Sequence, residues 1–236
     1  MFTWLNPLGY LSSRIVRPIG LAISFAALSS YYGDSVTRPL VGASLLAGAH
    51  AVIYGMSMSV SNERAFGTLE GWLASPQNIL GGICQRALPH LADGFVSGSL
   101  TYLVCCALFG ALPVALPEFA ALLLLALVSS FGLGLVMAGI ALRATDAFFW
   151  PNLANLALML FAGVLVSARG LPAPLRPVGS ALPLSHLMTF VTGQGGGALR
   201  CTGAELTVAA CWCAAGAVTI SIALARRGSR PAGAIP

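Results

Sequence analysis

The chain has 236 residues, of which 57% are hydrophobic and 8% are charged, and its mean hydropathy is +0.86. Lys, Arg, Asp and Glu normally dominate the surface of a soluble globular protein, and so few of them cannot cover one of this size. The net charge of +5 comes from dispersed Arg residues, without the aromatic-interleaved basic patch of a nucleic-acid-binding protein. The composition therefore excludes a soluble globule and predicts an integral membrane protein.

Six stretches are long enough to cross the hydrocarbon core as helices, which takes about 20 residues, and are almost free of ionisable side chains. Barrel strands are excluded because these stretches lack polar alternation, whereas helices pair their own backbone groups in lipid. The predicted fold class is an all-α membrane protein, a six-transmembrane-helix bundle in a single domain over residues 1–236. The predicted spans are residues 15–33, 39–60, 91–112, 118–142, 148–168 and 204–225.

Residues 1–14 precede the first span and contain Trp4, Leu5 and Tyr10, which predicts a short helix in the membrane interface. A signal peptide over about residues 1–30 is the alternative. The apolar start of the chain and the lack of a small-x-small cleavage site disfavour it.

The Arg residues predict that both chain termini are cytoplasmic and that the protein is a multi-pass protein of the cell (plasma or inner) membrane. With this orientation eight Arg residues lie inside and four outside, as the positive-inside rule requires. The inner residues are Arg14, Arg17, Arg64, Arg86, Arg143, Arg226, Arg227 and Arg230, and the outer residues are Arg38, Arg169, Arg176 and Arg200.

Three carboxylates lie close to predicted span boundaries. An intramembrane carboxylate often marks a transport pathway. Asp93 and Asp146, however, lie within about a turn of the cytoplasmic boundary, where Arg86 and Arg143 are available as partners. Glu205 has a comparable position at the outer end of the last span. We therefore expect interfacial positions for all three.

A compact amphipathic segment follows the second span on the expected cytoplasmic side. We expect one helix over residues 62–75, capped by Ser61 or Asn62 and ended by Pro76. Its acidic face would contain Glu63, Gly67 and Glu70, and its apolar face Phe66, Leu69, Leu73 and Trp72. Such a helix suits a lever that rests on the bundle and binds a soluble partner, or a loop helix that only covers the bundle.

The same segment resembles the E-R-x-x-G-T-L-E-x-x-x-x-S-P signature of the permease subunits of type 2 ABC exporters, which include drug, polysaccharide and lipid exporters. The matching residues are Glu63-Arg64, Gly67-Thr68-Leu69-Glu70 and Ser75-Pro76. Gly81-Gly82 and Arg86 follow as at the start of the family's third span, and residues 182–186 resemble its N-P-L-T-H element. Trp72 and Leu182 depart from the pattern, which has an aliphatic residue and Asn at those positions.

The resemblance implies that this chain is the membrane-spanning subunit of an ATP-driven exporter and is not itself an enzyme. ATP and Mg would be bound by a separate ATPase subunit, because a chain without Lys cannot form the G-x-x-x-x-G-K-[ST] loop. No cofactor is expected on this chain. A second permease subunit, identical or homologous, would complete a pathway for a hydrophobic or amphipathic drug, lipid or lipid-linked glycan. The implied ATPase-coupling residues are Glu63, Arg64, Phe66, Gly67, Thr68, Leu69, Glu70, Trp72, Ser75 and Pro76.

The outer loop, residues 169–203, is rich in Pro and then in Gly, which interrupt regular helix. We expect short re-entrant or interfacial helices here, before the sixth span. In the resembled family this region helps to close the outer end of the pathway, which makes Pro183, Leu184 and His186 the outer-gate candidates. His186 beside Ser185 is also what an ordinary packed polar residue looks like.

Two other functional classes remain open. A secondary transporter or channel would need midplane charges or two matched halves with broken helices, and the sequence contains no internal repeat. An intramembrane serine hydrolase is suggested by Ser57 in Gly55-Met56-Ser57-Met58 together with His186, which are expected on opposite sides of the membrane. The six Cys residues are spaced poorly for chelation or for a disulfide, so no metal site is predicted.

Overall fold

The computed structural model describes residues 7–33, 35–76, 78–144, 146–165, 167 and 170–228. These residues form helices joined by turns, with no strand among them, which confirms the predicted all-α class. Within this part of the chain, four helices are long and apolar enough to cross a membrane. They are α3 (Thr37–Ala65), α5 (Ile79–Phe109), α6 (Leu116–Ala141) and α10 (Ala198–Gly228). Their length and composition indicate a membrane protein.

The first predicted span corresponds to α2 (Arg17–Tyr31), whose 15 residues fall short of the about 20 that cross a bilayer. α2 nevertheless continues α1 (Pro7–Leu11) and a π-helical turn, η1 (Ser12–Val16), without interruption. α1 lies within the predicted interfacial helix. Trp4 and Leu5 of that helix lie outside the described residues.

The fifth predicted span, residues 148–168, is wrong in its second half. α7 (Phe149–Phe161) has 13 residues and ends because Gly163 adopts a φ of +84°, a left-handed conformation that a helix cannot contain. Ala168 and Arg169 lie outside the described residues.

The third predicted span begins too late, because α5 starts at Ile79 rather than at Leu91. The side chain of Asn78 caps the helix by accepting a hydrogen bond from the Gly81 amide at 3.3 Å. Pro89 is accommodated inside the helix, although it cannot donate a backbone hydrogen bond there. Arg86 and Asp93 therefore stand within a long helix and not at its boundary.

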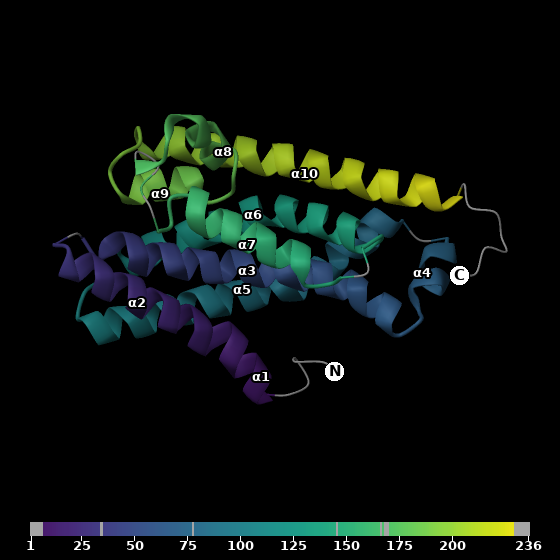
Figure 1. Cartoon of the computed structure of the whole chain (residues 1–236), viewed down its shortest axis with the longest axis horizontal. Coiled ribbons are helices and arrows are strands. Elements are labelled where there is room, and N and C mark those ends of the chain that lie inside the picture. Colours follow the sequence, from purple (N-terminus) through teal and green to yellow (C-terminus); the bar gives the residue numbers. More distant parts are fainter. Residues whose placement is uncertain are drawn as a thin grey trace.

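Figure 1 shows the long helices lying side by side, with their connections gathered at two ends. The end that we call the α4 end contains α4 (Leu69–Ala74), the α6–α7 connection and the last turns of α10. The opposite end, the α8 end, contains the α2–α3 and α5–α6 connections. It also contains η3 (Ala173–Leu175), α8 (Arg176–Ser180) and α9 (Ser185–Val191), which replace regular helix before α10, as the Pro and Gly content predicted.

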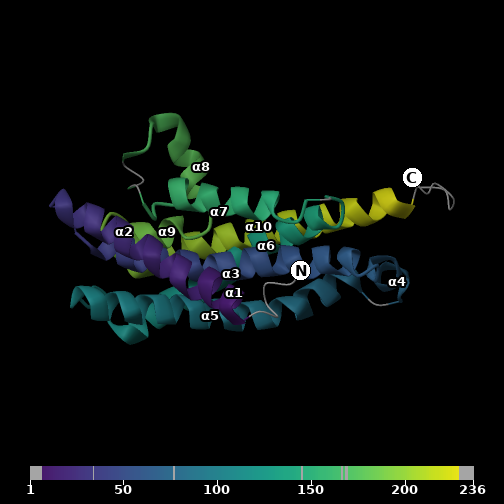
Figure 2. The same cartoon turned by 60° about the horizontal axis from the view of Figure 1, so that its bottom comes forward.

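α3 lies in the middle of the bundle, between α5 on one side and α6 and α10 on the other, and most of its length is buried (Figure 2). Gly residues let the long helices touch through their backbones. A Cβ atom on Gly94 of α5 would lie 2.8 Å from the carbonyl oxygen of Gly48 in α3, and one on Gly216 of α10 would lie 2.4 Å from Cβ of Leu135 in α6. α3, α5, α6 and α10 therefore form one closely packed unit.

Candidate functional site

The predicted single helix over residues 62–75 is wrong, because the segment bends in its middle. α3 continues through Glu63 and Arg64 to Ala65, so Ser61 and Asn62 lie inside that helix and cap nothing. Gly67 adopts a φ of +72°, and its amide donates to the Arg64 carbonyl at 3.0 Å, while the Thr68 amide donates to the Glu63 carbonyl at 2.9 Å. This pair of hydrogen bonds around a left-handed Gly is a Schellman motif, the standard way to end a helix.

α4 begins immediately after this turn and contains Leu69–Ala74. Ser75 has an extended backbone, as expected for a residue before Pro76, and its hydroxyl donates to the Trp72 carbonyl at 2.8 Å. The end of the helix at Pro76 therefore agrees with the sequence. The segment consists of the last turn of α3, a tight turn and a helix of fewer than two turns.

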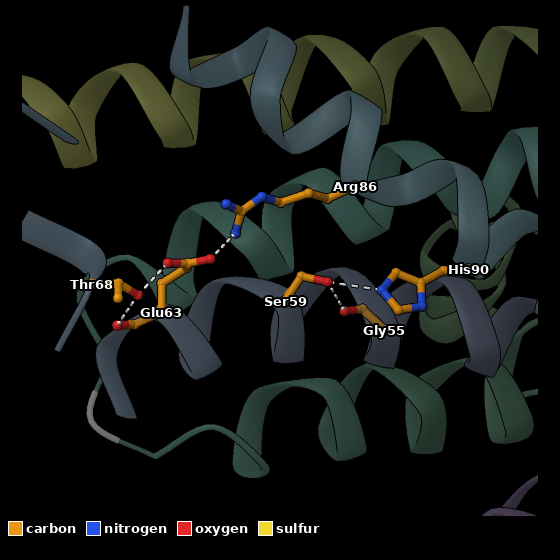
Figure 3. A network of polar contacts seen from close by, with 6 residues as sticks. All are labelled: Gly55, Ser59, Glu63, Thr68, Arg86 and His90. Carbon is orange, nitrogen blue, oxygen red and sulfur yellow. Dashed lines mark hydrogen bonds and ion pairs between the residues drawn. The ribbon is translucent and has the colours of Figure 1, made fainter. Parts of the chain in front are cut away.

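Glu63 is the centre of a polar network at this end of the bundle (Figure 3). Its Oε1 atom lies 2.5 Å from Nη1 of Arg86 in α5, and its other carboxylate oxygen accepts a hydrogen bond from the Thr68 hydroxyl. The side chain of Glu63 is only 21% exposed, and that of Arg86 is 34% exposed. Glu63 therefore joins α3 to α5 and supports the turn into α4.

Arg86 also contacts α4. Its guanidinium carbon lies 4.2 Å from the centre of the Trp72 ring, a distance at which cation and ring attract each other. The same ring lies against Gly82 of α5, where a Cβ atom would come within 3.3 Å of Cζ2 of Trp72. Trp72 and Arg86 together hold α4 against the first turns of α5.

Arg64 extends this connection to α6. Its guanidinium donates to the carbonyl oxygen of Leu142 at 2.6 Å, and also to that of Ala144. Both carbonyls follow the last turn of α6, where helix carbonyls lack partners within the helix. The segment between Glu63 and Pro76 is thus attached to α3, α5 and α6.

Exposure divides the candidate coupling residues into two groups. Leu69 is 4% exposed and Trp72 is half-buried, so these two side chains pack against the bundle as expected. Phe66, also expected to pack there, is 63% exposed, which makes that expectation wrong. Glu63 and Arg64 were expected to face a partner, but both make the internal contacts described above. The exposed candidates at the α4 end are Phe66, Gly67, Thr68, Glu70 and Pro76, and their neighbours Gly71 and Ala74 are exposed as well.

The structure gives both inner carboxylates partners other than the expected Arg residues. Asp93 pairs with Arg14 of η1, with Oδ2 and Nε 3.2 Å apart, while Arg86 pairs with Glu63. Oδ1 of Asp146 accepts the amides of Phe148 at 2.8 Å and Phe149 at 3.1 Å, at the start of α7. The Asp93 pair joins two helices that are far apart in the sequence, and the Asp146 contacts depend on how the backbone turns before α7. The spacing of charged residues in the sequence reveals neither.

The outer-gate candidates Pro183, Leu184 and His186 lie at the start of α9, at the α8 end. Pro183 and Leu184 are buried, and Nε2 of His186 lies 3.1 Å from the Ser180 carbonyl oxygen. Glu205 of α10 contacts this segment. Its carboxylate accepts the Leu184 amide at 2.7 Å and the His186 amide at 3.2 Å, and the residue is 0% exposed. The expected interfacial position of Glu205 concerns its depth in the membrane and stays a prediction, whereas its burial against residues 181–191 was not predicted.

The residues of the hydrolase alternative are not brought together. Ser57 is buried in the half of α3 nearer to α4, whereas His186 belongs to α9 at the α8 end. The His residue that faces an α3 hydroxyl is His90 of α5, whose Nε2 lies 2.8 Å from Oγ of Ser59 (Figure 3). That hydroxyl also donates to the Gly55 carbonyl at 2.9 Å, an ordinary contact of Ser inside a helix.

The contacts of the α4 end suit a mechanical role more than a chemical one. Arg64 and Arg86 are held by carboxylate, ring and carbonyl groups, and the exposed residues belong to a short helix and the turn before it. No group of three metal-ligating side chains occurs among the described residues. No protein-family model, curated protein or solved structure matches this chain.

Proposed function

We propose that this chain is the membrane-spanning subunit of an ATP-driven exporter related to the type 2 ABC permeases. The observation that carries the proposal is the construction of the α4 end. There, the residues that resemble the family signature fall into an attached group and an exposed group. Glu63, Arg64 and Trp72 fix the segment to α3, α5 and α6, while Phe66 and Glu70 are left on the surface.

A coupling element needs both groups. Force applied to α4 by a partner reaches the long helices only if α4 cannot move independently of them. The Glu63–Arg86 pair and the Trp72 contact supply that attachment on the α5 side, and the Arg64 hydrogen bonds supply it on the α6 side.

The exposed group offers a surface for a soluble protein. Phe66 is a large apolar side chain at a polar end of the molecule, and Glu70 adds a negative charge in the next turn. Aromatic side chains are enriched at protein interfaces, and a charged residue such as Glu70 suits the polar rim of one. We assign this surface to the separate ATPase subunit, because the chain lacks the Lys of a nucleotide-binding loop.

The course of the chain supports the six-pass topology of such a permease. α2, α3, α5, α6, α7 and α10 run alternately toward the α8 end and the α4 end (Figure 1). If the α4 end is cytoplasmic, then Arg64, Arg86 and Arg143 lie on the cytoplasmic side of the membrane. Arg38, Arg176 and Arg200 then lie on the opposite side. Arg169 and Arg230 are not among the described residues. Both chain termini would then be cytoplasmic.

A second permease subunit, identical or homologous, is part of the proposal, because the resembled exporters use two such subunits. The substrate class is a hydrophobic or amphipathic molecule such as a drug, a lipid or a lipid-linked glycan. ATP and Mg belong to the partner. This chain supplies the pathway and its coupling element, and it hydrolyses nothing.

The test is a pull-down of the tagged full-length chain from solubilised membranes of its native host. We expect the wild-type chain to co-purify with a protein that contains a nucleotide-binding loop, and Glu70→Arg to lose that protein, because like charges then meet at the contact. Glu118→Arg is the matched control, since Glu118 is an exposed carboxylate in the first turn of α6 at the α8 end. It should behave like the wild type.

Three results would count against the proposal. Recovery of no nucleotide-binding protein with the wild-type chain would overturn the function. Equal recovery with Glu70→Arg and with the wild type would overturn the docking surface. ATP-independent transport by the purified chain in vesicles would favour a secondary transporter or channel.

A further inference from the structure

Glu205 has an unusual environment for a carboxylate in an apolar helix. It lies in the third turn of α10 and is 0% exposed, and both of its oxygens face the polypeptide that precedes that helix. Burying an ionised carboxylate is costly unless hydrogen bonds replace its water. The position therefore indicates a specific contact that repays this cost.

The contact is made to two backbone amides at the start of α9. Oε1 accepts the Leu184 amide at 2.7 Å and Oε2 accepts the His186 amide at 3.2 Å. Amides at the beginning of a helix have no partner inside the helix, so an acceptor must come from elsewhere. Ser129 of α6 lies close to the carboxylate, and its hydroxyl donates to the Ala126 carbonyl at 3.2 Å. Glu205 therefore connects α10 to the start of α9 beside α6.

The backbone at this point is strained. Leu184 has a φ of +74° and is the only residue other than Gly with a positive φ in the described part of the chain. An L-residue with a large apolar side chain rarely adopts this conformation unless its surroundings enforce it. The Leu184 amide makes the shorter of the two hydrogen bonds to Glu205. The carboxylate therefore binds the backbone at the strained residue itself.

α10 holds the segment at a second point, two turns further along the helix. Nε1 of Trp212 donates to the Ala181 carbonyl at 2.7 Å. On the other side, α9 packs into the bundle, where a Cβ atom on Gly42 of α3 would lie 3.1 Å from Cε of Met188. Residues 181–191 therefore lie between α10, to which they are hydrogen-bonded, and α3, against which α9 packs, at the α8 end.

We propose that Glu205 is a charge-dependent latch that keeps residues 181–191 closed over the α8 end, and that loss of its negative charge releases them. A neutral side chain of the same size would keep one acceptor oxygen and would turn an N–H donor toward the other amide. The strained conformation at Leu184 would then lose its main support. This latch is a property of the chain alone and does not depend on the ATPase proposed above.

The test is hydrogen–deuterium exchange of the full-length chain in nanodiscs, read by mass spectrometry. In Glu205→Gln we expect amides of residues 184–191 to exchange at least about tenfold faster than in the wild type, while peptides covering α4 do not change. Glu118→Gln makes the same chemical change at an exposed carboxylate of the same end. It should leave both regions unchanged.

Glu205→Gln and Glu118→Gln exchanging alike at residues 184–191 would overturn the latch. Faster exchange throughout the chain would overturn it as well, because the carboxylate would then support the whole fold and not this segment. If Glu205→Gln does not accumulate, Glu205→Asp keeps the charge and shortens the side chain by one methylene, so that the carboxylate reaches the Leu184 and His186 amides less well. That variant should accelerate exchange at residues 184–191 by a few-fold, and the absence of any acceleration there would also count against the proposal.

Discussion

The guanidinium of Arg86 in α5 lies 4.2 Å from the centre of the Trp72 ring in α4. The same group pairs with Glu63 at the end of α3, so one side chain touches the three elements that meet at the α4 end. The position of α4 relative to the bundle therefore depends on Arg86 more than on any of the exposed residues of α4.

Arg86→Ala should loosen α4 without unfolding the bundle. The variant removes a cation–π contact and a partly buried ion pair, which together stabilise α4 by about 1–2 kcal/mol. Amide exchange in residues 69–74 should accelerate by about tenfold. Arg143→Ala, at an exposed Arg in the neighbouring α6–α7 connection, is the control and should change nothing there. Unchanged exchange in Arg86→Ala would show that apolar packing of Leu69 and Trp72 holds α4 without the Arg86 contacts.

Gly67→Ala should destabilise the turn between α3 and α4, whereas Gly71→Ala should not. Both positions are open, with no atom within 4 Å of an added Cβ, so the two changes differ only in backbone conformation. Gly67 has a φ of +72°, where Ala costs about 1 kcal/mol. Gly71 is helical, where Ala gains up to about 1 kcal/mol. Amide exchange in α4 should therefore change in opposite directions, and a shared direction would contradict the Schellman turn.

Gly216→Ala should weaken the contact between α6 and α10. Its new Cβ would lie 2.4 Å from Cβ of Leu135 and 3.1 Å from the Val136 amide nitrogen, so the helices must separate, at a cost of about 1–3 kcal/mol. Gly203→Ala lies on the same helix with nothing within 4 Å and is the matched control. The measurement is thermal unfolding in detergent. Equal midpoints for the two variants would mean that the helices adjust without loss.

Tyr102→Phe should destabilise the α5–α6 connection. The Tyr102 hydroxyl donates to the Val114 carbonyl at 2.5 Å and accepts the Val114 amide at 3.0 Å, and the variant leaves both buried groups unpaired. The expected loss is about 1–3 kcal/mol, although the ring keeps its stack on Phe119. Tyr31→Phe, at a ring that is 83% exposed, controls for the chemical change. A midpoint for Tyr102→Phe no lower than that of Tyr31→Phe would contradict the assigned role of the hydroxyl.

The length of the apolar stretches predicted the four long helices well. A helix that crosses a membrane or fills the core of a bundle needs apolar side chains over many consecutive turns, so the signal is spread over many residues. The boundaries failed where a single residue decides. Gly67 was taken as one member of a helix face, although Gly after a run of helix formers is also the usual C′ residue. Gly163 ended α7 in the same way, within a stretch whose composition suits a continuous span.

The polar partners could not be predicted, because they join residues far apart in the sequence. Nothing in the spacing of charges indicates that Asp93 pairs with Arg14, or that Arg64 reaches the carbonyls after α6. Glu205 was recognisable as a carboxylate in an apolar stretch, but its burial depends on how residues 181–191 fold back onto α10. Contacts of this kind are known only when the helices are placed together.

α3 carries Gly42 beside Met188 of α9 near its first turns and Glu63 in its last turn. Its 29 residues correspond to a rod about 44 Å long, uninterrupted by Pro after its first turn. Twisting that rod about its own axis would shift the neighbours of both of its extremities together. The α4 end and residues 181–191 therefore both contact α3, and a change that turns or shifts α3 itself should reach both ends of the bundle, whereas a change confined to one end should not.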